Sequence, residues 1–480
     1  MEALTFDTVK KKSISGIVAL TSRTFLIQII AFTATAVLMA YLDPAIFGVF
    51  YIVSAVINFL RYFSDIGLAA ALIQKKSQLT LEDYRTTFTI QQILVAFIII
   101  VALLLTNFIK KFYSLSPEAV WLFWALLFSF FLSSLKTIPT IIMERHLEFK
   151  KLIIPQILET IGFYVVAAIL AWQGLKLTTF TYAVVVQSLV GLIATYFICP
   201  WKISFGMSGK TARSLLTFGI PFQLNSFLAL VKDDLFTLFL GKVLPLGEIG
   251  YIGWAKKWAE IPLRLFLDSV VKVTFPAFSR LQQARPVLGK AINETLFGLS
   301  ATIFPAAVGL LFLVEPLIAL VPRYAKWQPA LFSFGIFVVS SAISALSVPL
   351  TNTLNAIGKI KITLNLMIMW TVLTWILSFI LINMIGFNGV AVAFLLITST
   401  VSLVIYIVKR FAPLAFISAV GFPFIGALLE SLWFYVVLQL VPNTLINLIL
   451  AGIIGLGIYM VFVYQTQKQR ILRITGRIFG

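Results

Sequence analysis

Residues 86–106 read TTFTIQQILVAFIIIVALLLT, without a charged side chain and with an unbroken apolar run from Ile93 to Leu105. A helix needs about 20 mainly apolar residues to cross roughly 30 Å of hydrocarbon, because each residue advances it by about 1.5 Å. This segment meets that requirement and predicts a membrane-spanning helix. Thirteen further segments of the chain have the same character.

The composition agrees with this interpretation. Of the 480 residues, 60% are hydrophobic and only 11% are charged, and the mean hydropathy is +1.02. A water-soluble domain carries about a quarter charged residues because it needs a polar surface. The chain is therefore expected to lie in a lipid bilayer.

We expect an all-α, polytopic membrane protein with about 14 transmembrane helices. Pro305, Pro316 and Pro349 fall inside the ninth and tenth segments, where proline can kink or break a helix. The short connections leave no room for a soluble catalytic domain. The expected spans are 14–40, 46–66, 86–106, 119–143, 152–172, 177–199, 214–240, 249–275, 291–321, 329–355, 362–384, 386–408, 414–440 and 445–464.

The basic residues predict the orientation. Of the 37 Lys and Arg residues, 23 fall in one alternating set of connections and termini, six in the opposite set and eight inside the spans. Cytoplasmic loops carry an excess of Lys and Arg. We therefore expect both termini in the cytoplasm. The net charge of +19 is then mainly an orientation signal, and no nucleic-acid partner is expected.

Two similar turns point to an internal repeat. Leu42–Gly48 follows the first span and Val243–Gly250 follows the seventh, with matching prolines 201 positions apart and matching glycines 202 apart. A six-helix unit repeated with unchanged orientation explains this offset, and such parallel lobes are a transporter plan. The alternative is that proline and glycine turns recur in any polytopic protein.

Charged residues inside the spans mark candidate functional positions, since an ion at mid-membrane costs about 2.5 to 3.5 kcal/mol. In the eighth span such residues follow a helical stripe of alternating sign at 257, 260, 264, 268 and 272. The stripe is interpreted either as a self-neutralised seam or, as we favour, as the wall of a cavity for an anionic ligand. Candidate anion-binding residues are Arg23, Arg61, Lys136, Lys232, Lys256 and Arg264. Candidate ion-coupling residues are Glu159, Asp233, Asp234 and Asp268.

Catalytic chemistry has little support in the sequence. A single cysteine, Cys199, excludes an internal disulfide, and a single histidine, His146, leaves no His-rich metal site. We expect no catalytic residues, no metal site and no cofactor. Tryptophans 121, 124, 254, 258 and 327 fall near predicted outer span ends, where most are expected to anchor the protein at the interface.

Three motifs, in this order, resemble the polysaccharide-export branch of the multidrug/oligosaccharidyl-lipid/polysaccharide (MOP) exporter superfamily, the Wzx-like flippases. They are Phe63–Gln74, Met143–Leu152 and Phe275–Leu281, and the turn Asp43-Pro44 to Gly48 precedes them. The resemblance implies two six-helix lobes in a MATE-like V, at 1–205 and 206–411, followed by two extra helices and a tail at 412–480. It also implies alternating access that moves a glycan linked to a polyprenyl pyrophosphate across the bacterial inner membrane.

The leading hypothesis is therefore a flippase for a lipid-linked oligosaccharide in surface polysaccharide biosynthesis. It would be a monomer coupled to H⁺ or Na⁺. One alternative is a cation-coupled small-molecule exporter of the same superfamily, although the net basic set of intramembrane charges disfavours cationic drugs. A membrane-embedded glycan-transferring enzyme is a further alternative, disfavoured because a large outward loop and an intramembrane histidine are both missing from the sequence.

Overall fold

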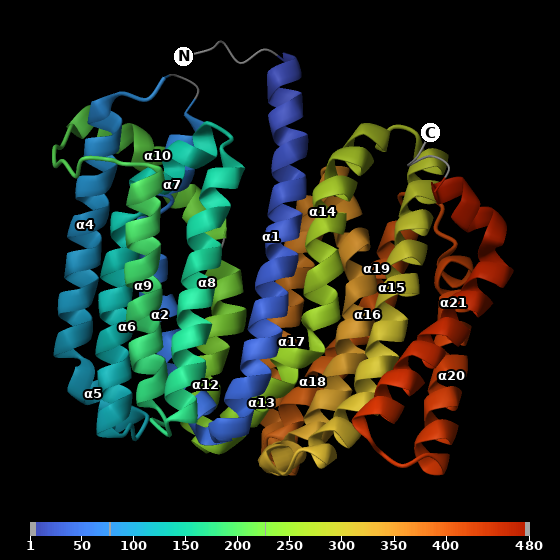
Figure 1. Cartoon of the computed structure of the whole chain (residues 1–480). Coiled ribbons are helices and arrows are strands. Elements are labelled where there is room, and N and C mark those ends of the chain that lie inside the picture. The colour runs from blue at the N-terminus through green and yellow to red at the C-terminus, as the bar shows by residue number, and fades with distance from the viewer. Residues whose placement is uncertain (1–5, 76–77, 226, 476–480) are drawn as a thin grey trace. The chain divides into compact units, whose positions relative to one another are not determined.

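The computed structural model describes residues 6–75, 78–225 and 227–475 (Figure 1). In these ranges every regular element is a helix, which confirms the all-α prediction. Twelve helices of the described chain are long and apolar enough to cross a membrane. The two predicted spans missing from this set, 214–240 and 249–275, are present as interrupted helices.

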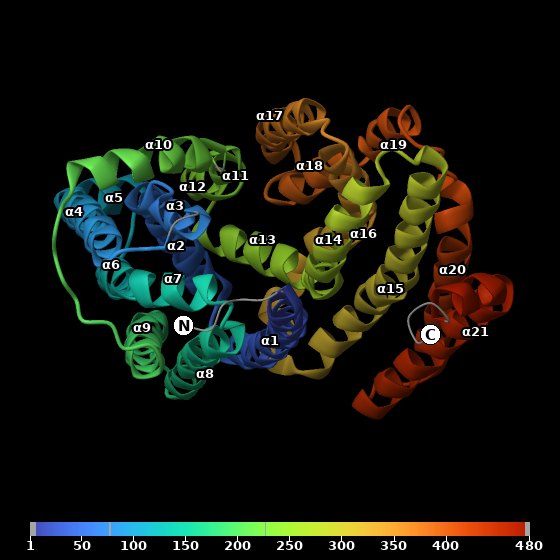
Figure 2. The ribbon, with the colours of Figure 1, turned by 90° about the horizontal axis from the view of Figure 1, so that it is seen from above.

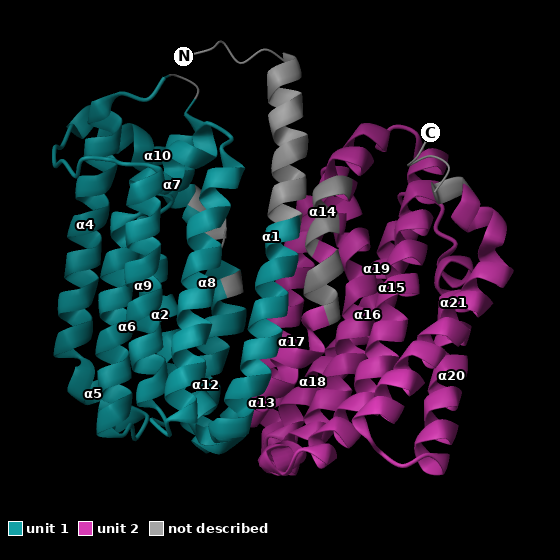
Figure 3. Ribbon diagram, in the orientation of Figure 1, with its two compact units in different colours: residues 1–250 teal, residues 251–480 magenta. Residues whose placement is uncertain are grey.

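The chain divides by its internal contacts into two compact units, Met1–Gly250 and Tyr251–Gly480 (Figure 3). The division predicted from the sequence, at residues 205 and 411, is a different one and stays a prediction. The difference arises because residues 209–243 contact the N-terminal helices, as described below for the helix that begins at Gly209.

Unit 1 is a helical bundle. Helix α8 contacts α1 and α9, and α6 contacts α2, α4 and α9. Seen from above, α10 runs beside α3 and α4 (Figure 2). Its helices are α1 (Phe6–Tyr41), α2 (Pro44–Asp65), α3 (Leu68–Gln74), α4 (Leu81–Leu104), α5 (Thr106–Phe112), α6 (Pro117–Leu135), α7 (Thr137–Arg145), α8 (Phe149–Trp172), α9 (Thr178–Ile198), α10 (Gly209–Asn225), α11 (Phe227–Leu230), the π-helical turn η1 (Val231–Leu235), α12 (Phe236–Val243) and the beginning of α13 (Leu246–Ala259).

Local sequence explains where these helices begin. Pro44 opens α2 after the extended Asp43, because the proline ring fixes φ and the first helical N–H needs no partner. Thr80 and Asp83 form a capping box before α4: the Asp83 N–H donates to Thr80 Oγ1 at 3.3 Å, and the Thr80 N–H donates to Asp83 Oδ2 at 2.9 Å. Lys75 Nζ lies 2.7 Å from the other Asp83 oxygen, which satisfies a carboxylate that is almost fully buried.

A buried apolar cluster holds one end of unit 1 together. Leu68 and Leu72 of α3 pack with Phe88 of α4, Ile138 of α7 and Leu215 of α10. These side chains come from four helices separated by more than 140 positions in the chain. The cluster explains why the segment after residue 208 groups with the N-terminal helices.

The two turns that predicted a repeat meet in space. A β-carbon on Gly48 of α2 would lie 1.8 Å from the carbonyl oxygen of Leu246, and one on Gly250 of α13 would lie 1.9 Å from that of Pro44. Leu246 and Gly250 follow Pro44 and Gly48 by the same 202 positions. The contact is therefore reciprocal, and both helices need glycine to approach this closely.

The described residues of the predicted span 214–240 are helical, but a π-helical turn interrupts the regular α-helix. They belong to α10, α11, η1 and α12, and the π-helical turn contains Lys232, Asp233 and Asp234. Likewise 249–275 is divided at Glu260 into α13 and α14 (Ile261–Leu281). Pro262 at the start of α14 removes an N–H donor from the helical ladder, while Glu260 keeps right-handed angles (φ −84°, ψ −6°), so the interruption is mild.

Unit 2 contains the remaining long helices. Helix α15 contacts α14, α16, α20 and α21, and α20 contacts α21. Pro305 and Pro316 lie inside one continuous α15, and Pro349 lies inside α16, so none of the three divides its predicted span. The further elements are α15 (Arg285–Leu320), the 3₁₀ segment η2 (Pro322–Ala330), α16 (Leu331–Ala356), α17 (Ile360–Ile385), α18 (Asn388–Thr398), α19 (Val401–Lys409), α20 (Phe416–Leu440) and α21 (Leu445–Thr475).

Tryptophans divide between surface and core. Trp121 and Trp124 are exposed on α6, as interface anchors should be. Trp254 and Trp327 are fully buried, with their rings tilted against each other and ring centres 5.5 Å apart, and Trp258 is buried beside Trp254. The prediction of interface anchors is therefore wrong for these three, which form part of the aromatic core of unit 2.

Candidate functional site

Lys136 and Glu159, predicted for anion binding and ion coupling, form an ion pair with each other. Lys136 lies at the junction of α6 and α7, and Glu159 lies on α8. Both side chains are mostly buried, with 14% and 20% of their surfaces exposed. Each charge thereby offsets part of the desolvation cost of the other.

Helix α9 is shaped around this pair. A β-carbon on Gly191 would lie 1.8 Å from Glu159 Oε1. A side chain at position 191 would have to displace the Glu159 carboxylate, so Gly191 lets the carboxylate lie between α8 and α9 without a clash. The ion pair therefore has a dedicated place in the packing of unit 1.

Asp234, predicted for ion coupling, lies in the π-helical turn η1 and faces α2. Asn58 Nδ2 of α2 donates to Asp234 Oδ1 over a long 3.4 Å. Asp233 is exposed, whereas Lys232 and Asp234 are half-buried. A π-helical turn is rare and often occurs at functional sites, because it displaces side chains from the regular helical positions.

A reciprocal pair of hydrogen bonds, which sequence reasoning missed, joins the same two segments. Gln223 Nε2 of α10 donates to the carbonyl oxygen of Tyr62 at 2.7 Å, and the Tyr62 hydroxyl donates back to the carbonyl oxygen of Gln223. These bonds join the end of α2 to the interrupted helix. A polar Gln223 in an apolar context was the available signal, but it did not identify its partner.

Arg23 and Arg61 have no ionic partner in the part of the chain that the structure describes. Arg23 on α1 is half-buried, and its Nε is buried without an acceptor among the described residues. Arg61 on α2 is exposed, and its guanidinium carbon lies 5.7 Å from the centre of the Phe130 ring. Both guanidinium groups thus keep hydrogen-bonding capacity for an acceptor.

The remaining candidates are on α13 and α14. Lys256 is half-buried, with Nζ 4.8 Å from the centre of the Phe394 ring in unit 2, a cation–π contact. The side chains of Arg264 and Asp268 lie outside the described residues, although their backbone belongs to α14. The structure thus brings together Lys136 with Glu159 and Asp234 with Asn58.

The chemistry of these residues is that of binding. The donors include a buried guanidinium Nε, an exposed guanidinium and a lysine over an aromatic ring, all of which suit phosphate oxygens. Carboxylates lie beside a base or an amide, where they can take up a cation or a proton.

Residues 37–331 match the model of a protein family described as polysaccharide biosynthesis protein. The chain belongs to this polysaccharide biosynthesis family. Its resemblance to the Wzx-like branch, noted from three motifs, is thereby confirmed.

Curated members of similar sequence extend over nearly the whole chain. It is 24% identical over 473 residues to the succinoglycan biosynthesis transport protein ExoT of Rhizobium meliloti, covering 92% of this chain and 91% of that protein. It is also 24% identical over 392 residues to the lipopolysaccharide biosynthesis protein WzxC of Escherichia coli, covering 81% of this chain and 79% of that protein.

Solved structures confirm the predicted MATE-like fold for this family member. The lipid II flippase MurJ in an inward closed conformation matches with a TM-score of 0.75 and 16% identity, over 94% of this chain and 99% of that one. A multidrug resistance MATE family transporter of the MOP superfamily, in an inward-facing conformation, matches with a TM-score of 0.64 and 16% identity, over 82% of this chain and 99% of that one.

Proposed function

We propose that the protein is a flippase that moves a polyprenyl-pyrophosphate-linked oligosaccharide across the bacterial inner membrane for surface polysaccharide biosynthesis. One observation carries the proposal. The two interrupted helical segments, α10–α12 and α13–α14, hold six of the ten candidate residues in a protein whose other long helices are mainly apolar. Interrupted polar helices at membrane depth form the substrate sites of many transporters.

The positive side chains suit the head of such a carrier. A pyrophosphate is anionic and rich in acceptor oxygens, so arginine can bind it through two N–H groups and lysine as a compact charge. Arg23, Arg61, Lys136, Lys232, Lys256 and Arg264 are the proposed contacts. The polyprenyl tail stays in the bilayer while the charged head crosses along these residues.

The crossing of α2 and α13 supports alternating access. By the predicted orientation, with both termini cytoplasmic, Gly48 and Gly250 lie at the outer side of the membrane. We propose that these two helices separate at this crossing when the outer side of the transporter opens.

Asp233, Asp234, Asp268 and Glu159 are the proposed coupling residues for H⁺ or Na⁺. Asp234 is the best placed of the described set, because its hydrogen-bond partner Asn58 is neutral and 3.4 Å away. Glu159 has a cation partner already, so its release from Lys136 would have to accompany ion uptake. In this proposal the monomer carries out no covalent chemistry.

Translocation in proteoliposomes tests this function. A labelled polyprenyl-pyrophosphate glycan is added to the outer leaflet, and a membrane-impermeant reagent reports the fraction that remains accessible. Lys256→Ala and Arg264→Ala should each slow translocation by roughly 10- to 100-fold, because a hydrogen bond to a charged group contributes about 1.5 to 3 kcal/mol. The exposed Lys110→Ala is the control and should match the wild type.

If correctly folded wild-type protein translocates the glycan no faster than liposomes without protein do, the protein is not a flippase for this substrate. Size-exclusion profiles of the variants show whether a slow rate reflects misfolding. Transport of a small cationic drug at a high rate, without glycan translocation, would instead support a small-molecule exporter.

A further inference from the structure

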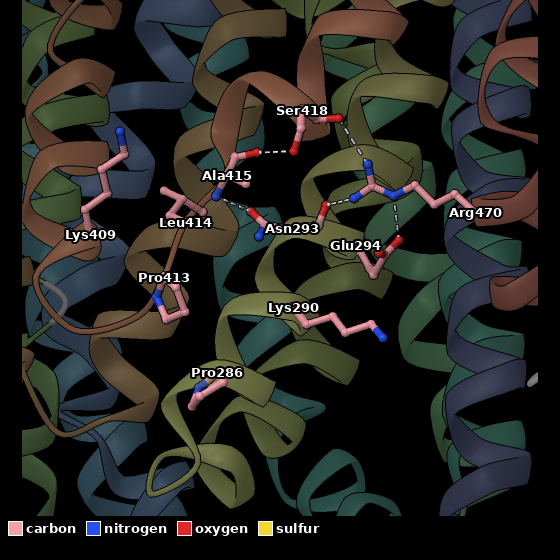
Figure 4. Close-up of a pocket in the computed structure, with 10 residues that line it drawn as sticks. All are labelled: Pro286, Lys290, Asn293, Glu294, Lys409, Pro413, Leu414, Ala415, Ser418 and Arg470. Carbon is pink, nitrogen blue, oxygen red and sulfur yellow. Dashed lines mark hydrogen bonds and ion pairs between the residues drawn. The ribbon is translucent and has the colours of Figure 1, made fainter.

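A pocket in unit 2 lies where the last two helices join the rest of the unit (Figure 4). Its volume is about 780 Å³, and it is lined by the first turns of α15, the α19–α20 connection and the end of α21. None of the candidate transport residues lines it. The site therefore needs an explanation beyond the proposed function.

Arg470 of α21 builds one wall of the pocket. Its Nε lies 2.8 Å from Glu294 Oε2, and its two terminal nitrogens donate to the carbonyl oxygens of Ser418 and Asn293 at 3.2 and 2.9 Å. The guanidinium also lies 4.4 Å from the ring centre of Phe297. All these contacts bring α15, α20 and α21 together at one side chain.

The α19–α20 connection forms another wall and is held in place. The Ala415 N–H donates to Asn293 Oδ1 at 3.1 Å. A β-carbon on Gly289 of α15 would lie 2.3 Å from the carbonyl oxygen of Pro413, so the connection lies directly against the helix. The pocket is thus bounded by fixed backbone, which is the condition for a preorganised binding site.

The pocket has an excess of positive charge. Lys290, Lys409 and Arg470 line it with a single carboxylate, Glu294, which is already bonded to Arg470. Within the described residues, neither Lys290 nor Lys409 has an ion-pair partner. Figure 4 shows the three basic side chains coming from three different segments. Helices α15 and α20 both begin here, and the partial positive charge of their first turns adds to this excess.

We propose that this pocket binds a phosphate group of an anionic molecule at the membrane surface. Lys290 and Lys409 would contact the phosphate oxygens. Arg470, already bonded to Glu294, would keep α15, α20 and α21 in position around the pocket. The basic-residue bias predicts that this end of unit 2 is cytoplasmic, where anionic phospholipids attract basic residues. Exposed apolar side chains adjoin lining residues in the chain: Ile417, next to Ser418, is 84% exposed, and Val287, next to Pro286, is 51% exposed. An acyl chain could lie against them while the head group enters the pocket.

Binding of two probes to the full-length, delipidated protein tests the proposal. The first is phosphatidylglycerol, compared with phosphatidylcholine, and the second is inorganic phosphate. The test variant is Lys290→Ala/Lys409→Ala, in which both substituted side chains are exposed and the Arg470 contacts remain. The matched control is Lys150→Ala/Lys361→Ala, which removes two exposed positive charges outside the pocket.

The wild type should prefer phosphatidylglycerol to phosphatidylcholine. The test variant should lose roughly 30-fold in affinity for phosphatidylglycerol at low ionic strength, as expected for two lysines near a phosphate. The control should keep wild-type affinity. If inorganic phosphate competes with phosphatidylglycerol for binding to the wild type, and the test variant does not bind inorganic phosphate, the natural ligand is a soluble phosphate compound. Equal affinities in the wild type and the test variant, an equal loss in the control, or binding of neither probe would overturn the proposal.

Discussion

Gly48 of α2 and Gly250 of α13 lie at one helix crossing, and each occupies a position where a side chain would overlap the backbone of the other helix. The two glycines are separated by the same 202 positions as the residues that they contact, Pro44 and Leu246. The crossing therefore has a local two-fold character. The repeat that the matching turns predicted stays a prediction, and the turns gave no sign that they would contact each other.

Substitution at this crossing should destabilise the folded protein. Gly48→Val or Gly250→Val places carbon atoms where the opposite carbonyl oxygen lies, so the helices must separate. Overpacking in a well-packed core costs about 1 to 3 kcal/mol, and a clash with backbone should reach the upper end. Thermal unfolding in detergent measures the effect.

Gly247→Ala is the matched control, because a β-carbon at Gly247 meets no atom within 4 Å. It lies on the same first turn of α13 and should melt like the wild type or slightly higher. Equal melting temperatures for Gly48→Val, Gly250→Val and Gly247→Ala would mean that the crossing tolerates side chains, contrary to our description.

The Lys136–Glu159 pair predicts non-additive effects. Lys136→Met leaves a mostly buried carboxylate without its cation and should cost about 2 to 4 kcal/mol, somewhat less than for a fully buried pair. Glu159→Gln should cost a similar amount. The double variant Lys136→Met/Glu159→Gln should recover much of the loss, since no uncompensated charge remains.

Chemical denaturation of the four proteins gives the coupling free energy. A value of at least about 1 kcal/mol is expected for a close pair with little exposure. Additive effects would indicate that the two groups do not interact. If the double variant is stable yet slow in translocation, the pair also acts in transport. If the double variant is stable and translocates the glycan at the wild-type rate, the pair has only a structural role.

Arg470 should control how tightly the end of α21 is held. Arg470→Ala removes three hydrogen bonds, one of them to Glu294, and should increase hydrogen exchange in residues 445–475 and around 415–418. A hydrogen bond to a charged group contributes about 1.5 to 3 kcal/mol, so local opening should become roughly tenfold or more frequent. Lys468→Ala, an exposed position two residues earlier, should leave the exchange pattern unchanged. If Arg470→Ala and Lys468→Ala show the same hydrogen-exchange pattern, Arg470 does not hold the end of α21 in place.

Sequence predicted the approximate limits of twelve of its fourteen expected spans, because long uncharged runs are a direct property of local composition. It missed how Lys136 and Glu159 are joined, since their contact depends on the packing of α6–α7 against α8 and on a glycine of α9. It also predicted interface anchors at Trp254 and Trp327, because depth along a span does not tell which face of the helix is buried.

The interrupted helices show a second limit. Polar residues at 231–235 were visible in the sequence, but a π-helical turn depends on hydrogen bonding that no residue pattern specifies. The pocket of unit 2 was missed for a different reason. Lys290, Lys409 and Arg470 were interpreted as orientation signals, and a positive charge in a loop has the same appearance whether or not it also lines a binding site.

Dependence of translocation on the pyrophosphate is the most direct test of the central claim. In proteoliposomes, the wild-type protein is given the same glycan on two carriers of equal chain length, one linked through a pyrophosphate and the other through a neutral ether. We predict translocation of the pyrophosphate-linked glycan at least tenfold faster, which corresponds to about 1.4 kcal/mol of preferential interaction with the basic residues. Equal rates for the two carriers would contradict the claim that these intramembrane basic residues bind the anionic head of the substrate.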